Sequence, residues 1–373
     1  MNGQWIGFTR AGATNNGFII LNFLLGSAAE ARVIFYDFNL ANPGVTAKVS
    51  FVLNNDVLDG RLSNFEEWDS RTRRRLPREE NETRSLRSGV VRAELAGNKI
   101  EGHWETNIGT TGSFSLINRF YLSDGEGSDE HRPYVQSIGW KEFKRQVDGE
   151  ESDSARQIIY RGQSGAWPLR TSYCRAGGTC LRHYLKDCLS DVSRHINSES
   201  NHKYSLKKDE DVAALMNLAQ HHGYPTPILD WTESPFVAAF FAFESAVRIA
   251  RGQKKVSIFQ MNLGKDSVSD DFARWILEAP FPIIKIGRFP AFDNNRALPQ
   301  QAVGLFSNID DIEEMIRIQG IQGKESMQRW DIPLTERDLV MRDLRRMGIT
   351  AASMFPGLDG ICRSLKEQHF LSQ

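Results

Sequence analysis

Residues 218–243, LAQHHGYPTPILDWTESPFVAAFFAF, decide the fold of the C-terminal part of this chain. Gly223 and Pro225 end a helix predicted over 212–222, because glycine terminates helices and proline does not continue them. Residues 226–231 have the composition of a buried strand, and Ser234-Pro235 can cap and begin another helix. Polar side chains stand at these junctions, which suits a pocket built from strand and helix ends: Gln220, His221, His222, Asp230, Trp231 and Thr232.

Length and composition indicate a soluble two- or three-domain protein. The chain has 373 residues and a formal net charge of −1, which demands neither nucleic acid nor an anionic membrane as partner. The N-terminus lacks the pattern of a signal peptide, and the longest apolar run, 235–243, is too short to span a bilayer. We therefore expect a cytoplasmic protein that does not enter a membrane.

The cysteines and one charged segment give weaker indications. The four cysteines form no Cys-x-x-Cys pair and no Cys/His spacing of a zinc site, so we expect reduced thiols and no metal. Seven arginines crowd residues 71–87, interrupted by glutamates. This segment is either a solvated loop or an arm that binds phosphates.

Residues 1–122 are predicted to be an antiparallel β-barrel or a sandwich. Gly, Asn, Asp and Pro separate short apolar runs, as strands joined by tight turns require. Closure into a barrel would remove the exposed sheet edges. The expected strands are 5–8, 18–25, 31–38, 46–53, 57–65, 89–95, 99–105 and 112–117.

Two Gly-x-Trp units, Gly3-Gln4-Trp5 and Gly102-His103-Trp104, begin an early and a late strand of this part. Together with residues 109–114, GTTGSF, they resemble the strand pattern of lipocalin- and avidin-like barrels. The resemblance concerns shape, and the interior can hold either a ligand or the barrel's own side chains.

A polar linker, residues 123–134, is expected to lead into a mixed α+β domain over 135–373. Strands are predicted at 157–160 and 256–263, and helices at 138–147 and 181–196. The helix that follows Pro235 carries aromatic and aliphatic side chains on most of its sides, so it should lie in the domain centre. Residues 344–359 are expected to form a helix, a strand and a turn.

Four motifs stand out in this part of the chain: Tyr160-Arg161-Gly162-Gln163 with Trp167 and Leu169; the 218–243 stretch; Asn295-Arg296 with Gln300, Gln301 and Gly304-x-Phe306; and residues 354–360, MFPGLDG. Together they resemble the FRG domain, a family named for its aromatic-Arg-Gly motif. The resemblance covers about 135–365 and implies a role in bacterial stress or phage defence. One departure is that Ala302-Val303 separate the glutamine pair from Gly304, so either Gln300 or Gln301 holds the family's position.

The order of these residues also resembles ADP-ribosyltransferases, though more weakly. There, an arginine on an aromatic-Arg-Gly strand holds the dinucleotide, a strand with Ser or Thr frames the nicotinamide pocket, and a third strand supplies Glu or a substitute. The resemblance implies that Arg161 binds NAD and that Gln300 or Gln301 takes the third position. The expected NAD-binding residues are Tyr160, Arg161, Gly162, Gln163, Trp167, Thr226, Trp231, Thr232 and Arg296.

The residue chemistry is compatible with this role and with simpler ones. A guanidinium at a strand end suits phosphate binding, although Arg161 can equally serve a structural salt bridge. Asp230 is the nearest carboxylate to oppose an oxocarbenium-like charge, or else a turn acceptor. His221, at a helix C-terminus that favours imidazolium, can orient a substrate or bond to the helix carbonyls. The expected catalytic residues are Asp230, His221, Gln300 and Gln301.

The leading hypothesis is an enzyme that uses NAD as substrate, without a metal, and transfers ADP-ribose to a macromolecule or to water. The barrel would then sense a signal or direct the protein to a target. A second hypothesis is a non-catalytic module that binds a nucleotide or nucleic acid. A third is an interaction protein whose barrel binds a peptide or small ligand.

Overall fold

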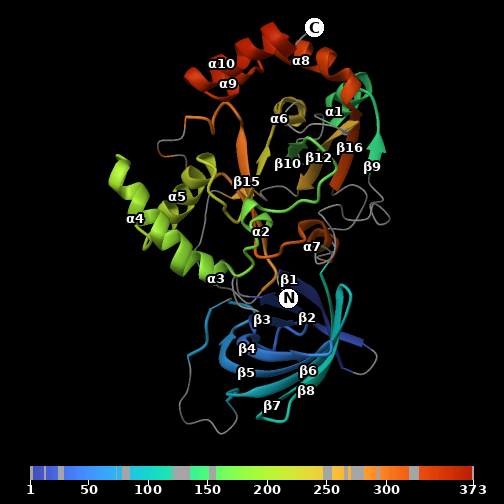
Figure 1. Ribbon diagram of the computed structural model, residues 1–373, viewed down its shortest axis with the longest axis vertical. Coiled ribbons are helices and arrows are strands. Elements are labelled where there is room, and N and C mark those ends of the chain that lie inside the picture. The colour runs from blue at the N-terminus through green and yellow to red at the C-terminus, as the bar shows by residue number, and fades with distance from the viewer. Residues whose placement is uncertain are drawn as a thin grey trace.

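The computed structural model describes residues 3–11, 14–23, 29–72, 74–77, 85–118, 120, 135–150, 157–246, 254–263, 268–269, 281–290, 292, 295–318 and 327–371. A β-barrel forms one end of the molecule, and an α+β region (residues 135–371) forms the rest (Figure 1). The predicted linker 123–134 lies outside the described residues, as do Arg73, Arg78 and Arg84 of the arginine-rich segment.

The N-terminal strands form a closed antiparallel barrel, which confirms the barrel alternative. Each strand pairs with the next along the chain, and β1 also pairs with β8 to close the sheet. Alternate side chains fill the interior, among them the fully buried Trp5, Phe23 and Ile100. The strands are β1 (Gln4–Ala11), β2 (Thr14–Phe23), β3 (Glu30–Asp37), β4 (Gly44–Asn54), β5 (Val57–Trp68), β6 (Gly89–Ala96), β7 (Lys99–Thr106) and β8 (Thr111–Ile117).

The α+β region contains a mixed sheet in the order β13-β14-β15-β11-β10-β12-β16-β9. The strands are β9 (Val135–Ser137), β10 (Gln157–Gln163), β11 (Ile228–Thr232), β12 (Lys255–Leu263), β13 (Val268–Ser269), β14 (Ile284–Gly287), β15 (Ala302–Ser307) and β16 (Met327–Pro333). The helices are α1 (Trp140–Glu150), α2 (Ser172–Arg175), α3 (Leu181–His183), α4 (Leu189–Glu199), α5 (Asp209–His221), α6 (Pro235–Ala246), α7 (Ile312–Ile318), α8 (Arg337–Arg346), α9 (Ala351–Met354) and α10 (Leu358–Lys366).

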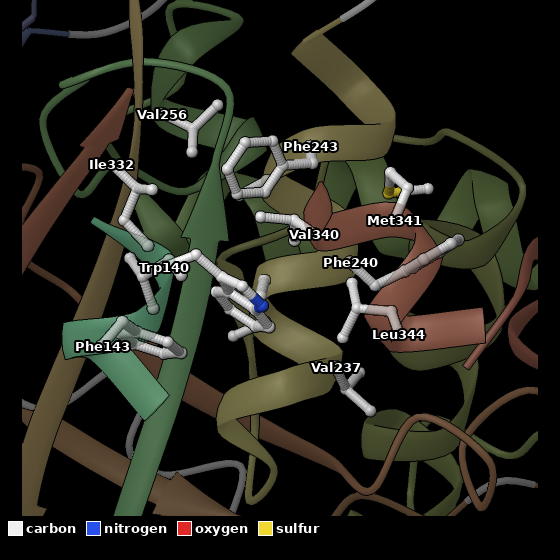
Figure 2. Packing of buried hydrophobic residues seen from close by; sticks show 14 of the residues in the cluster. Trp140, Phe143, Val237, Phe240, Phe243, Val256, Ile332, Val340, Met341 and Leu344 are labelled. Atoms are coloured by element: carbon white, nitrogen blue, oxygen red, sulfur yellow. The ribbon is translucent and has the colours of Figure 1, made fainter. Parts of the chain in front are cut away.

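Helix α6 is buried in the centre of the α+β region, as its aromatic composition predicts. Its Phe240 and Phe243 are fully buried between α1, α8 and the strands β12 and β16 (Figure 2). The helix also packs closely on β10, because a Cβ added at Gly162 would lie 1.8 Å from the main-chain oxygen of Ala238. Gly162 therefore permits the contact between the strand and the helix main chain.

The prediction for residues 344–359 is wrong in one respect. These residues, all of them described, contain no strand: α8 ends at Arg346, and α9 follows over Ala351–Met354. Thr350 caps α9, since its hydroxyl accepts from the Ser353 main-chain N–H at 3.2 Å and the Ser353 hydroxyl accepts from the Thr350 N–H at 2.9 Å. This reciprocal cap stabilises a helical turn where apolar residues had suggested a strand.

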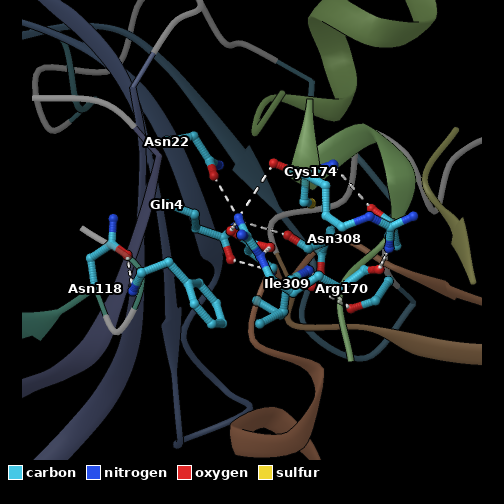
Figure 3. A network of polar contacts seen from close by, with 12 residues as sticks. Gln4, Asn22, Asn118, Arg170, Cys174, Asn308 and Ile309 are labelled. Carbon is cyan, nitrogen blue, oxygen red and sulfur yellow. Dashed lines mark hydrogen bonds and ion pairs between the residues drawn. The ribbon is translucent and has the colours of Figure 1, made fainter. Parts of the chain in front are cut away.

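Buried polar contacts join the barrel to the α+β region (Figure 3). The Gln4 amide of β1 donates to the Asn308 carbonyl at 2.8 Å, and its oxygen accepts from the Asp310 main-chain N–H at 2.7 Å. Arg170 forms a two-pronged ion pair with the Asp310 carboxylate at 2.7 and 2.6 Å. An apolar cluster, in which Ile309 and Met315 meet Ile6, Phe18 and Ile20 of the barrel, adds to this contact.

Glu66 of β5 forms a second polar contact between the two parts. Its carboxylate accepts from Arg32 of the barrel at 2.9 Å and from Arg182 of α3 at 2.6 Å. Burial alone would raise the pKa of Glu66, but Arg182, Arg32 and Arg75 outweigh it and hold the pKa below its ordinary value.

We expect Glu66→Gln to lower the free energy of unfolding by about 2 kcal/mol, because two largely buried guanidinium groups would lose their carboxylate. Urea unfolding at neutral pH measures the change. Glu67→Gln is the matched control, since the described residues include no ion-pair partner for Glu67. Equal effects of the two substitutions would show that the Glu66 ion pairs contribute nothing specific.

Candidate functional site

The candidate site lies where strands β10 and β11 separate. Both strands are described in full, and their only paired position is Tyr160 with Thr232, whereas β10 pairs with β12 along its whole length. Beyond that position, Arg161 Nη1 donates to the main-chain oxygen of Asp230. The arginine side chain thus takes the place of a main-chain hydrogen bond and lies where the pairing between β10 and β11 stops.

A chain of side-chain hydrogen bonds reaches Asp230 from the helix before it. The Thr226 hydroxyl donates to the Gln220 amide oxygen, and the Gln220 amide nitrogen donates to Asp230 Oδ1. Ser172 of α2 fixes the start of this chain, because its hydroxyl accepts from the Thr226 main-chain N–H at 3.0 Å. The orientation of the Asp230 carboxylate is therefore set by α2 and α5.

Arg161 is surrounded by protein yet incompletely bonded. Burial and, to a smaller extent, Arg175 lower the pKa of Arg161, the Asp230 carboxylate opposes them, and the net pKa is about 10. Its Nε atom is buried and has no hydrogen-bond partner among the described residues. Such a donor is costly to leave unpaired, and a bound anion would satisfy it.

Arg175, on α2, is a second cation beside Asp230. Burial lowers its pKa, and Arg170 lowers it further, while Asp230 and other acidic groups oppose the shift. Its Nη1 donates to the Arg170 carbonyl at 2.5 Å, which holds the guanidinium in place. The two arginines repel each other across one carboxylate, so negative charge at this site would stabilise both.

Asp230 combines solvent access with close protein surroundings. The residue is exposed at the surface, yet burial of its carboxyl group among neighbouring atoms raises its pKa. Arg161, the Gln220 amide and Arg175 oppose that rise. A carboxylate in such surroundings can accept a proton more readily than an ordinary aspartate.

His221 directly follows Gln220, and the guanidinium of Arg296 lies near its ring. Burial, the largest cause, lowers the pKa of His221 together with Arg296 and His222, to about 4. The ring is therefore neutral at pH 7, contrary to the expectation of an imidazolium, because burial and a nearby guanidinium outweigh the helix dipole. Arg296 itself lies over the Phe355 ring, 5.4 Å from its centroid.

Three predicted NAD-binding residues, Gly162, Gln163 and Trp167, lie close to Arg161 in the chain. Gly162 faces the α6 main chain, as described above. The Gln163 amide donates to the Trp167 carbonyl at 2.7 Å and closes the loop after β10. Trp167 is partly exposed, so its ring can still meet a ligand.

The structure places Tyr160, Trp231, Thr232 and Thr226 in the interior, away from surface that a ligand can reach. Tyr160 is 5% exposed and Trp231 is 2% exposed, in two separate apolar clusters. The Thr232 hydroxyl donates to the Gln300 carbonyl at 2.7 Å. In this conformation these residues position strands, and neither aromatic ring presents a face to a nicotinamide.

Gln300 and Gln301 lie just before β15, near the C-terminal end of β11. The Gln300 amide donates to the Met354 carbonyl at 2.8 Å, so it holds α9 against the sheet. Gln301 is exposed, with φ +46°, and its carbonyl accepts from the Glu233 main-chain N–H at 3.1 Å. Gln301 is therefore the one of the pair whose side chain is free to turn toward a ligand.

Two residues at the site have no assigned role in the sequence-based prediction. Gln220 stands among the junction residues of the 218–243 stretch, but nothing in its spacing indicates a bond to Asp230. Arg175 ends the short helix α2, whose contact with β11 cannot be read from local pattern. The role of each residue depends on how one element packs against another.

The described part of the chain has no group of three or more His, Cys, Asp or Glu side chains placed as metal ligands would be. In the same part, no helix has the length and apolar character needed to cross a bilayer.

Residues 156–250 match the model of the FRG domain. The chain contains an FRG domain. The match spans β10, β11 and α6, and so includes Arg161, Thr226 and Asp230. Comparison with curated proteins gave no match.

Two solved β-barrels are similar to about a third of the chain. A redesigned β-barrel, mFAP1, bound to DFHBI, is 10% identical over 31% of this chain and 94% of that chain, with a TM-score of 0.22. Fatty-acid-binding protein 1 of Echinococcus granulosus is 9% identical over 32% of this chain and 96% of that chain, with a TM-score of 0.17.

The lowered pKa of His221 predicts a pH dependence for the stability of the FRG domain. Between pH 6.5 and about 4 the unfolded chain binds a proton at His221 that the folded chain does not, so stability falls as the pH falls through this window. His221→Gln should remove about 1 kcal/mol of that loss, a figure reduced for partial exposure. Urea unfolding at several pH values measures it. His195→Gln, at an exposed position on α4, should keep the wild-type profile.

Proposed function

We propose that the FRG domain binds the nucleotide NAD at the Arg161–Asp230 site and breaks its nicotinamide–ribose bond. The observation that carries this proposal is the buried, unpartnered Nε of Arg161, which stands with Arg175 beside a solvent-accessible carboxylate. Two cations that repel each other favour a ligand with two negative phosphates, and a planar guanidinium can hold a phosphate with two parallel bonds.

The carboxylate suits the bond-breaking step. When the bond between the ribose C1′ and the nicotinamide nitrogen breaks, the electron pair leaves with nicotinamide and the ribose becomes oxocarbenium-like. The negative charge of Asp230 opposes that positive charge. Water or an acceptor group then bonds to C1′, and its proton passes to Asp230, whose raised pKa suits it to accept one.

The barrel is assigned the part of a sensing or targeting module. The side chain of Arg170 pairs with Asp310, whose main-chain N–H donates to Gln4 of the barrel. The main-chain carbonyl of Arg170 accepts from Arg175 at the site. A ligand or partner that moves β1 would thereby act on the group of residues that holds Arg175.

A second function, nucleotide binding without cleavage, is favoured by one observation. The Gln300 amide is already bonded to the Met354 carbonyl, and neither Gln300 nor Gln301 carries a carboxylate that could fix the ribose. Under this alternative Asp230 only orients Gln220 and Arg161.

Incubation of the purified full chain with NAD tests both functions. The expected result is that free nicotinamide and ADP-ribose, or an ADP-ribosylated protein, accumulate together as NAD disappears. Calorimetry on the same material measures NAD binding. Binding without nicotinamide release would establish the second function in place of the first. The absence of both binding and release, with candidate acceptor proteins also present, would reject both.

A further inference from the structure

Helix α10 presents an apolar face to solvent. Leu358 is 81% exposed, and Ile361 and Leu365 are 47% and 46% exposed. At 100° per residue these three positions fall within one 60° sector of the helix. The opposite side is fixed to the protein, since a Cβ at Gly360 would lie 1.8 Å from the Phe355 carbonyl oxygen. A surface helix normally places its apolar side inward, so this reversed arrangement indicates a face that another surface covers.

Charged residues of α10 follow one edge of this apolar face. Asp359 and Lys366 lie on the same side of the stripe, about 80–100° from Leu358 on the helical wheel. Both are exposed. Arg363 is turned inward, over the Phe355 ring at 4.8 Å, and also contacts Asp359 at 2.9 Å. The outer edge thus carries one negative and one positive charge, two helical turns apart.

We propose that the partner of this face is a second copy of the same chain, with the two α10 helices packed antiparallel. A two-fold axis perpendicular to both helices brings the same edge of each helix together. Asp359 of one copy then faces Lys366 of the other, and the reverse pair forms at the other end. A parallel pair would bring each charged edge against Ser364 and Gln368, which offer no opposite charge.

The same arrangement pairs the apolar residues. Leu358 of each copy packs on Leu365 of the other, and Ile361 and Cys362 lie beside the two-fold axis. Cys362 is a free, exposed thiol. Helices α8 to α10 form the end of the molecule farthest from the barrel, so the two barrels point away from each other (Figure 1).

Helices of this length bury less than the roughly 1,600 Å² of a standard interface, so we expect a dimer that dissociates on dilution. Sedimentation of the full chain across the micromolar range should show a monomer–dimer equilibrium. Leu358→Asp should raise the dissociation constant at least about 100-fold, because it places a charge against Leu365 of the other copy at both ends of the apolar contact. The matched control is Leu298→Asp, an 88% exposed leucine outside α10, which should leave the equilibrium unchanged.

A charge exchange tests the antiparallel direction. Lys366→Glu should weaken the dimer by placing two carboxylates opposite each other, and the double variant Lys366→Glu with Asp359→Lys should restore it. Mild oxidation of the wild-type protein should produce a disulfide-linked dimer through Cys362, which Cys362→Ser abolishes. Circular dichroism confirms that each variant is folded.

A protein that stays monomeric at every concentration and forms no Cys362 cross-link would overturn the proposal. Equal effects of Leu358→Asp and Leu298→Asp would do the same. A dimer whose affinity the charge exchange does not restore would contradict the antiparallel arrangement.

Discussion

Replacing Arg161 with alanine is expected to reduce nicotinamide release from NAD by about 100-fold or more. The reason is that Arg161 supplies a buried donor at the interruption between β10 and β11, and no other described side chain donates to the Asp230 carbonyl there. Arg161→Lys keeps the charge but loses the planar pair of donors, so we expect an intermediate loss of about 10-fold. Initial rates of nicotinamide release at saturating NAD, with NAD binding measured separately, provide the comparison.

Arg145→Ala is the matched control for this prediction. Arg145 is an exposed arginine of α1 that pairs with Glu142, a residue of the same helix. Its replacement should leave both NAD binding and cleavage unchanged. If Arg161→Ala remains folded and retains full NAD binding and cleavage, Arg161 has no role in the site. A variant that unfolds would instead assign Arg161 to the sheet, and the Arg161→Lys result then decides whether charge alone suffices.

Gly162→Ala is expected to lower the free energy of unfolding by about 3 kcal/mol or more. The added Cβ would lie 1.8 Å from the Ala238 carbonyl oxygen and 2.9 Å from the Ala242 nitrogen. Both atoms belong to the main chain of α6, which is buried and cannot turn aside as a flexible side chain would. Urea unfolding, or the yield of soluble protein where the variant fails to fold, measures the effect.

The opposite sign is expected for Gly149→Ala. Gly149 lies in α1, and a Cβ at that position meets nothing within 4 Å. Alanine there should stabilise the helix by about 0.5–1 kcal/mol, because glycine is a poor helix former. If both substitutions had similar effects, the close approach of β10 to α6 would not be the reason for Gly162.

The sequence correctly predicted those helices and strands whose ends are marked by Gly, Pro, Asn or Asp. Gly223 and Pro225 mark the end of α5, Pro235 opens α6, and the turns of the barrel carry Gly, Asn and Asp. The aromatic side chains on most sides of α6 correctly predicted that this helix is buried. The strand expected within residues 344–359 was wrong because Thr350 and Ser353 form a reciprocal helix cap that stabilises a helical turn there.

The candidate site was only partly predictable. Arg161 and Asp230 were both named from the sequence, and they contact each other because they lie on the neighbouring strands β10 and β11. Trp231 is buried in the core instead of shielding a ligand, since strand alternation turns it toward Leu305 and Phe259. The role of Gln220 depends on how α5 approaches β11, and a single sequence does not carry that information.

The contact between Gln4 and the α+β region has a consequence for evolution. The Gln4 carboxamide bonds to the Asn308 carbonyl and the Asp310 N–H, while Ile309 and Met315 pack on apolar barrel residues. A related FRG protein that lost its barrel would expose both apolar side chains and leave the Asp310 main-chain N–H without its acceptor. Its lineage would then come under selection for polar substitutions at 309 and 315. Apolar residues at these two positions therefore mark FRG proteins that carry the barrel, and polar residues mark those without it.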